Sequence, residues 1–124
     1  MTGPNMNTIL IVDDEYLIAD ILGFALEDEG FLIEKAGNGR KALEALKEKR
    51  VDLVITDYMM PVVNGEELLA AIRQELQLTD LPVILMSGAQ ASQERVGPQL
   101  FSAVFDKPFD MDRMIAKVRE LLGT

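Results

Sequence analysis

Short apolar runs alternate along the chain with longer segments in which apolar residues recur every three to four positions. A continuous aliphatic run is typical of a strand that is buried on both faces of a parallel sheet. The three-to-four spacing is typical of an amphipathic helix. The runs at 9–12, 31–33, 53–55, 83–86 and 103–105 therefore predict five strands, with a helical pattern after each.

Each of the clearer helical segments carries its apolar residues on one face, as amphipathic helices do. In the first helix they are Leu17, Ile18, Ile21, Leu22, Ala25 and Leu26; in the second, Ala42, Leu43 and Leu46; in the third, Leu68, Leu69, Ile72 and Leu76; and in the last, Met111, Met114, Ile115, Val118, Leu121 and Leu122. We expect the faces of the second and last helices in particular to point inward.

Residues that favour helix ends flank several of these segments. Asn64 and Asp110 can accept hydrogen bonds from the first backbone amides of the third and last helices. Gly30 and Gly123 can end the first and last helices, because glycine readily adopts the left-handed backbone found there. Asn38-Gly39 predicts a turn before the second helix.

The segment between the last two predicted strands has the weakest helical pattern. A fourth helix could begin near Gln90, but Gly97-Pro98 must break or end it, because proline has no amide proton to donate. We therefore expect this helix to be short or irregular.

Strict alternation of strands and helices indicates an α/β fold, with a parallel sheet covered by helices on both faces. Right-handed crossovers restrict the topology, and the leading arrangement is a doubly wound five-stranded sheet in the flavodoxin-like order 2-1-3-4-5. We expect one domain over residues 7–122, a flexible N-terminal segment over residues 1–6, and no output domain.

Composition narrows the classes of chemistry. The 124 residues include no cysteine and no histidine, which excludes thiolate and imidazole metal sites and histidine-dependent catalytic triads. The net charge of −9 disfavours direct contact with nucleic acid. No apolar run approaches the roughly 20 residues of a membrane-spanning helix, and the start of the chain does not resemble a signal peptide. We therefore expect a cytoplasmic protein that does not associate with membranes.

Polar residues of complementary chemistry follow four of the predicted strands. Asp13 and Asp14 follow the first strand, Asp57 the third, Ser87 the fourth and Lys107 the fifth. In an open α/β sheet, ligands bind beyond the carboxyl ends of the strands, where the strand order reverses. With strands one and three as neighbours, we expect these side chains to share one crevice.

Three carboxylates in one crevice repel each other and favour a bound cation. Mg²⁺ suits such a site, because it prefers oxygen ligands and often shares its coordination shell with a phosphate. A carboxylate can act as a nucleophile, and a hydroxyl and an ammonium group can donate hydrogen bonds to phosphoryl oxygens. The set therefore favours phosphoryl transfer onto an aspartate. Taken singly, each of these residues could instead be an ordinary cap, turn or solvated loop residue.

The sequence resembles the receiver domains of response regulators over about residues 7–122. Four segments carry the resemblance: Ile-Leu-Ile-Val-Asp-Asp-Glu at 9–15, Asp-Leu-Val-Ile-Thr-Asp-Tyr-Met-Met-Pro at 52–61 with Gly65, Val-Ile-Leu-Met-Ser-Gly-Ala at 83–89, and Lys-Pro-Phe at 107–109. The resemblance implies a part in two-component phosphorelay signalling. The domain would be no enzyme beyond catalysing its own phosphorylation and dephosphorylation.

The resemblance also implies a role for each site residue. Asp57 would accept the phosphoryl group, with Ser87 and Lys107 contacting it. Asp14 would bind Mg²⁺ directly, Asp13 mostly through water, and the backbone carbonyl of Met59 would be a further ligand. The Lys107-Pro108 peptide bond would be cis.

Partners are implied in the same way. The phosphoryl donor would be a sensor histidine kinase or a histidine phosphotransfer protein. The output would be a changed affinity for a downstream protein target, or onward transfer of the phosphoryl group in a relay.

The chain departs from the family pattern at the fifth strand. Three residues before the lysine, the family usually has an aromatic residue, and this chain has Val104. Phe105 comes next and should point to the opposite face of a regular strand. The segment from Ser87 to Lys107 is about two residues shorter than is typical of the family. We therefore expect the usual aromatic switch to be absent or altered.

Three other functions fit parts of the pattern. A haloacid-dehalogenase-type phosphatase needs an Asp-x-Asp motif after its first strand, and Asp13-Asp14-Glu15 lacks that spacing. A flavin-binding flavodoxin needs a phosphate cradle at the same turn, where three acids would repel the phosphate. A degenerate receiver that binds partners without phosphorylation remains an alternative because of Val104.

Overall fold

The computed structural model describes residues 7–58, 63–87 and 101–124. Within these residues, five parallel strands form one sheet in the order β2-β1-β3-β4-β5, as predicted. The strands are β1 (Thr8–Val12), β2 (Leu32–Ala36), β3 (Leu53–Asp57), β4 (Val83–Ser87) and β5 (Ala103–Asp106). The described helices are α1 (Tyr16–Asp28), α2 (Gly39–Glu48), α3 (Gly65–Gln74) and α5 (Met111–Leu122).

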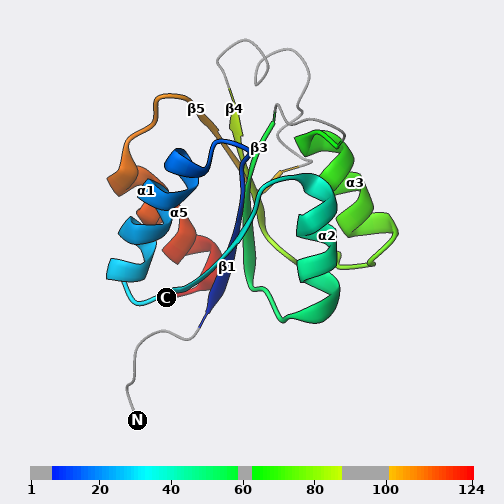
Figure 1. The fold of residues 1–124 in the computed structure, drawn as a ribbon. Coiled ribbons are helices and arrows are strands. Elements are labelled where there is room, and N and C mark those ends of the chain that lie inside the picture. Colours follow the sequence, from blue (N-terminus) through cyan, green and yellow to red (C-terminus); the bar gives the residue numbers. More distant parts are fainter. Residues whose placement is uncertain (1–6, 59–62, 88–100) are drawn as a thin grey trace.

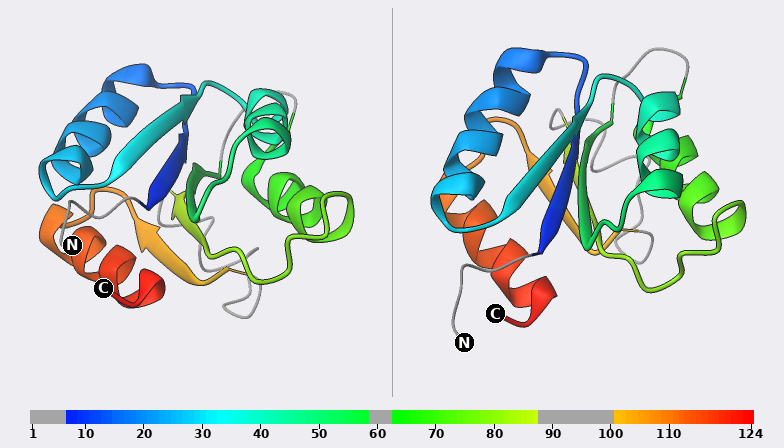
Figure 2. Two further views of the ribbon diagram at one scale, coloured as in Figure 1. Left: turned by 90° about the horizontal axis from the view of Figure 1, so that it is seen from below. Right: turned by 60° about the horizontal axis from the view of Figure 1, so that its bottom comes forward.

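The helices form two layers around the sheet. Helices α1 and α5 lie side by side on one face, and α2 and α3 cover the other (Figures 1 and 2). The predicted fourth helix and its Gly97-Pro98 break fall in residues 88–100, outside the described residues.

Both faces of the central strands are buried, which explains their continuous apolar runs. Along β1, Ile9 and Ile11 belong to the core under α1 and α5, whereas Leu10 and Val12 belong to the core under α2 and α3. This alternation follows from the period of two residues in a strand. The two cores hold β1, β3 and β4 in fixed register, and so fix the positions of the residues at their carboxyl ends.

The structure corrects the prediction at two element boundaries. The second strand spans Leu32–Ala36 rather than 31–33, because its pairing with β1 continues to the partner of Val12. Asn38 is the N-cap of α2 and accepts a hydrogen bond from the Lys41 amide at 2.8 Å. The predicted turn at Asn38-Gly39 is therefore the start of the helix.

The predicted apolar face of α1 is only partly buried. Leu22 and Leu26 are buried in the core, as an amphipathic pattern leads one to expect. Leu17 and Ile21, however, are 67% and 62% exposed. The helix has more large apolar residues than the sheet can cover, so sequence periodicity alone could not indicate which of them face the core.

The caps of α3 and α5 agree with the sequence-based prediction. Asn64 accepts a hydrogen bond from the Glu67 amide at 2.8 Å, and the Glu67 carboxylate accepts one from the Asn64 amide at 2.9 Å. This reciprocal pair is a capping box. Asp110 caps α5, and Gly123 ends it with a φ of 73°. The two caps fix the starts of α3 and α5, which follow Asp57 and Lys107 along the chain.

Asn64→Ala should lower the free energy of unfolding by about 1 kcal/mol, because alanine cannot accept the Glu67 amide hydrogen bond. Urea denaturation followed by circular dichroism would measure the change. Asn64→Asp is the matched control, since its carboxylate keeps the acceptor and should retain most of the stability. Equal destabilisation by the two substitutions would show that the cap contributes little.

Candidate functional site

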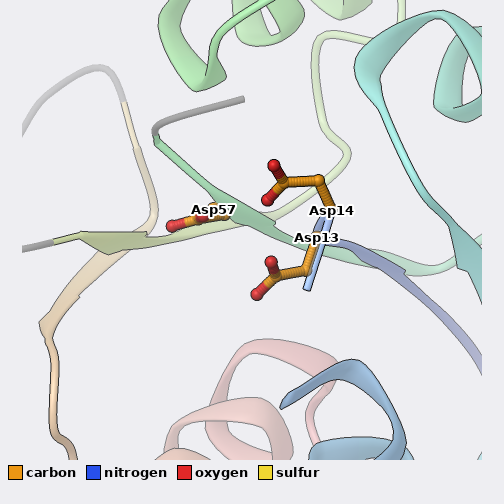
Figure 3. Close-up of side chains that lie close together, drawn as sticks. All are labelled: Asp13, Asp14 and Asp57. Carbon is orange, nitrogen blue, oxygen red and sulfur yellow. The ribbon is translucent and has the colours of Figure 1, made fainter. Parts of the chain in front are cut away.

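Three acidic side chains converge where the strand order reverses between β1 and β3. Asp13 and Asp14 directly follow β1, and Asp57 is the last residue of β3. Each offers a carboxylate oxygen, and these three oxygens lie within 4.8 Å of one another. Figure 3 shows the carboxylates of Asp13, Asp14 and Asp57 gathered at this end of the sheet. Asp13 and Asp57 are buried, whereas Asp14 is exposed and gives the site an opening to solvent.

Lys107 completes the charged cluster from the other side. It follows β5, and its Nζ lies 3.0 Å from Asp57 Oδ1 and 3.8 Å from Asp13 Oδ2. Its backbone amide donates a hydrogen bond to the Ser87 carbonyl at 2.7 Å, which ties the segment after β5 to the end of β4. The Lys107-Pro108 peptide bond is cis, as the family resemblance implied.

Ser87 is the last residue of β4 and is fully buried. Its side-chain oxygen has no hydrogen-bond partner among the described residues. Buried hydroxyl groups are nearly always hydrogen-bonded in native proteins. Among the described residues, the Ser87 hydroxyl is therefore a donor that no protein group satisfies.

The backbone around Asp57 holds its carboxylate in place. The Tyr58 amide donates a hydrogen bond to Asp57 Oδ1 at 3.0 Å, and the Gly65 amide donates one to the Tyr58 carbonyl at 2.9 Å. A Cβ atom at Gly65 would lie 3.0 Å from the Asp57 carbonyl oxygen and 2.9 Å from a methyl carbon of Leu85. Glycine is therefore required for α3 to begin this close to the end of β3.

Burial and neighbouring charges shift the pKa values of Asp13, Asp57 and Lys107. Burial raises the pKa of Asp13 to about 6, although the Glu15 amide hydrogen bond opposes this. Burial also raises the pKa of Asp57, and Lys107 works in the opposite direction. Burial tends to lower the pKa of Lys107, but its hydrogen bond to Asp57 and the charges of both aspartates outweigh this and raise it. The site thus concentrates negative charge that one ammonium group does not fully offset.

The residues of the cluster fit a divalent cation with a preference for oxygen. Asp13 Oδ2 is buried and has no hydrogen-bond partner among the described residues, and its nearest cation is 3.8 Å away. An added cation would stabilise this oxygen and relieve repulsion among the carboxylates. The all-oxygen donor set is the one that Mg²⁺ prefers. Met59, whose carbonyl was predicted as a ligand, lies outside the described residues.

The structure brings the five predicted side chains, Asp13, Asp14, Asp57, Ser87 and Lys107, to one end of the sheet. Sequence reasoning did not find the contribution of Tyr58, whose backbone amide contacts Asp57. The type of residue does not reveal this contact, because the backbone amide of any residue other than proline at that position could make it.

The predicted division of Val104 and Phe105 between opposite faces of the sheet is confirmed, since they pack against different cores.

Comparison with known proteins agrees with this geometry. A family profile described as "Response regulator receiver domain" matches residues 9–119. The transcriptional regulatory protein CpxR of Escherichia coli K12 is 37% identical over 119 residues, which cover 94% of this chain and 50% of CpxR. The probable transcriptional regulatory protein TcrX of Mycobacterium tuberculosis is 33% identical over 117 residues, which cover 93% of this chain and 49% of TcrX.

Solved structures show the same fold. The chemotaxis response regulator CheY4 of Vibrio cholerae matches with a TM-score of 0.85 and 28% identity, covering 95% of this chain and 100% of that one. The response regulator TrrA of Thermotoga maritima, solved in complex with Mg²⁺ and BeF, matches with a TM-score of 0.84 and 33% identity, covering 94% and 100%.

The sheet order, the acidic cluster and the match to the family profile together identify a signalling module of two-component systems. The chain belongs to the response regulator receiver domain family. It spans about half the length of the curated relatives that it matches. None of the described helices has the length and hydropathy that crossing a bilayer would require.

The raised pKa of Asp13 predicts a pH-dependent gain in stability for Asp13→Asn. Above pH 6, Asp13 is ionised in both the folded and the unfolded chain, and its burial costs free energy only in the folded one. The neutral amide of the variant would remove that cost, so the variant should be more stable by about 1–2 kcal/mol at pH 8. The gain should shrink as the pH falls from about 6 towards 4, because Asp13 becomes protonated in the folded state and no longer buries a charge there.

Urea denaturation in the presence of a chelator, between pH 4 and pH 8, would measure this difference. Repeating it at pH 8 with Mg²⁺ should shrink the gain, because a bound cation stabilises the unsubstituted site more than the variant. A difference that stays constant across the pH range would mean that the buried charge of Asp13 is not its cause.

Proposed function

We propose that this domain accepts a phosphoryl group on Asp57 and thereby changes its affinity for a partner protein. The observation that carries the proposal is the arrangement around one carboxylate. Asp57 lies at the switch point with two further acids within 4.8 Å and an ammonium group at 3.0 Å. At the end of the adjacent strand, the buried Ser87 hydroxyl has no hydrogen-bond partner among the described residues. These groups together meet the needs of phosphoryl transfer, which depends mainly on positioning and charge neutralisation.

The reaction would join a carboxylate oxygen of Asp57 to phosphorus while the bond from phosphorus to the donor breaks. The electron pair of the broken bond leaves with the donor atom, which is a ring nitrogen if the donor is a phosphohistidine. Both contacts of the Asp57 carboxylate with described residues, from Lys107 and the Tyr58 amide, are to Oδ1. We therefore assign Oδ2 as the oxygen that forms the new bond.

Asp13, Asp14 and Asp57 would hold Mg²⁺, with the Met59 carbonyl as a further ligand. When bound, Mg²⁺ would neutralise charge on the transferring phosphoryl group. Lys107 would contact a phosphoryl oxygen from its position beside Asp57, and the Ser87 hydroxyl would donate a hydrogen bond to another. The side chains of Asp13, Asp14, Asp57, Ser87 and Lys107 already lie at this end of the sheet, so they would need little rearrangement before transfer.

The donor would be a histidine kinase or a histidine phosphotransfer protein, because the chain belongs to the response regulator receiver domain family. We propose that the domain acts in the cytoplasm through a downstream protein target. A net charge of −9 makes direct contact of this domain with nucleic acid unfavourable. The domain would catalyse only its own phosphorylation and dephosphorylation.

Incubation with Mg²⁺ and a small acyl phosphate should add one phosphoryl group, as measured by intact mass. Asp57→Asn should abolish the addition, because an amide is not a suitable nucleophile for this reaction. A chelator should also abolish it, because the carboxylates would then repel the incoming phosphoryl group. Equal labelling of Asp57→Asn and the unsubstituted chain would show that another residue is the acceptor.

Ser87→Ala should slow phosphorylation by about tenfold without lowering stability. The hydroxyl has no partner among the described residues, so its removal costs the folded state no hydrogen bond, but it deprives the transferring group of a donor. Time courses of labelling by intact mass would measure the rate, and urea denaturation the stability. Ser87→Thr is the control, because it keeps the hydroxyl and should keep most of the rate. A rate for Ser87→Ala equal to that of the unsubstituted chain would contradict a role for this hydroxyl.

A further inference from the structure

Tyr58, the residue that follows Asp57, is held by its side chain as well as by its backbone. It is 3% exposed, and its ring packs in the core under α2 and α3. The hydroxyl at the end of the ring donates a hydrogen bond to Glu66 Oε1 at 3.1 Å. A buried tyrosine hydroxyl usually finds such a partner, because it has lost its hydrogen bonds to water. Next to Asp57, the same hydrogen bond also affects the acceptor carboxylate.

Glu66 lies in the first turn of α3, where a carboxylate interacts favourably with the helix dipole. The next residue, Glu67, is engaged in the capping box with Asn64. The residue before Glu66 is Gly65, whose amide donates a hydrogen bond to the Tyr58 carbonyl at 2.9 Å. A backbone hydrogen bond and a side-chain hydrogen bond therefore join Tyr58 to the start of α3.

The peptide unit between Asp57 and Tyr58 is held on both sides. Its carbonyl accepts a hydrogen bond from Thr56 Oγ1 at 3.0 Å. Its amide donates to the Met86 carbonyl at 2.9 Å and also to Asp57 Oδ1 at 3.0 Å. Because one amide serves two acceptors and hydrogen bonds weaken with misalignment, a small movement of Tyr58 changes its hold on Oδ1. The orientation of the Asp57 carboxylate thus depends on the position of Tyr58.

We infer that Tyr58 is a positioning residue for Asp57, and that its hydrogen bond to Glu66 keeps Asp57 Oδ2 turned towards the incoming phosphorus. The inference rests on the proposed function, which assigns Oδ2 as the oxygen that forms the new bond. The hydroxyl acts through the backbone: it fixes the ring, the ring fixes the Tyr58 amide, and the amide holds Oδ1. Because the rate of a reaction depends steeply on the placement of the reacting atoms, loss of the hydroxyl slows the transfer.

Tyr58→Phe tests the inference, because it removes the hydroxyl and keeps the ring. We expect labelling by acyl phosphate and Mg²⁺, followed by intact mass, to be about fivefold slower than in the unsubstituted chain. Tyr16→Phe is the matched control and should label at an unchanged rate, because Tyr16 is the only other tyrosine and is 72% exposed. Urea denaturation verifies that each variant is folded under the conditions of the assay.

Variants of Glu66 test the same hydrogen bond from its other end and leave the buried ring unchanged. Glu66→Gln keeps an oxygen acceptor and should retain most of the labelling rate, whereas Glu66→Ala should be slowed as much as Tyr58→Phe. Both variants remove the same charge, so the difference between them reports the acceptor. The double variant with Tyr58→Phe and Glu66→Ala should be no slower than either single variant, because the two substitutions break one hydrogen bond.

Amide hydrogen exchange at residue 58 tests the anchoring without any phosphorylation. In the absence of Mg²⁺, we expect this amide to exchange about fivefold faster in Tyr58→Phe and in Glu66→Ala, because local opening no longer breaks the side-chain hydrogen bond. In Glu66→Gln and Tyr16→Phe it should exchange as it does in the unsubstituted chain. Unchanged exchange in Tyr58→Phe and Glu66→Ala would overturn the anchoring.

Unchanged labelling rates in Tyr58→Phe and Glu66→Ala would overturn the positioning role, because a merely structural hydrogen bond affects stability and not the rate of the folded chain. Equal slowing by Glu66→Gln and Glu66→Ala would also overturn it, because the charge and not the acceptor would then be responsible. If the unsubstituted chain takes up no label, the proposed function fails. Amide exchange still decides whether the Tyr58 hydroxyl anchors the amide beside Asp57.

Discussion

The site depends on a balance of charges. Lys107 attracts the clustered carboxylates, while those carboxylates repel one another. Asp13 and Asp57 are both buried, so water screens their mutual repulsion only weakly. The Lys107 ammonium group lies 3.0 Å from Asp57 and 3.8 Å from Asp13, and it offsets part of this repulsion. The remaining negative charge favours a bound cation at this end of the sheet.

Such a cluster requires a rigid support, and the two cores supply it. The strands β1, β3 and β4 are apolar on both faces, so a shift in register would expose large apolar side chains on either side. Asp57 and Ser87 end two of these strands, and Asp13 follows the third directly. The free energy of burying the strands therefore holds the polar groups together against their repulsion.

The segment that follows β5 links the acidic cluster to the side of the sheet that α1 and α5 cover. Lys107 lies between the site and an apolar pocket beside α1, and the segment that it begins packs against Phe105. Phe105 of β5 packs in the core under α1 and α5, whereas Val104 packs on the other side of the sheet.

Local patterns in the chain were enough to predict the order of the strands and the side chains that meet at the site. Apolar runs and caps such as Asn64 act over a few residues, so their outcome can be read locally, and residues at strand ends meet once a parallel sheet is assumed. Three features depended on contacts between distant segments. These were the pairing that extends β2 to Ala36, the anchoring of Asp57 by the Tyr58 amide and the close approach at Gly65. The exposure of Leu17 and Ile21 followed from tertiary packing alone, because the area that the sheet and α5 can cover limits how much of α1 is buried.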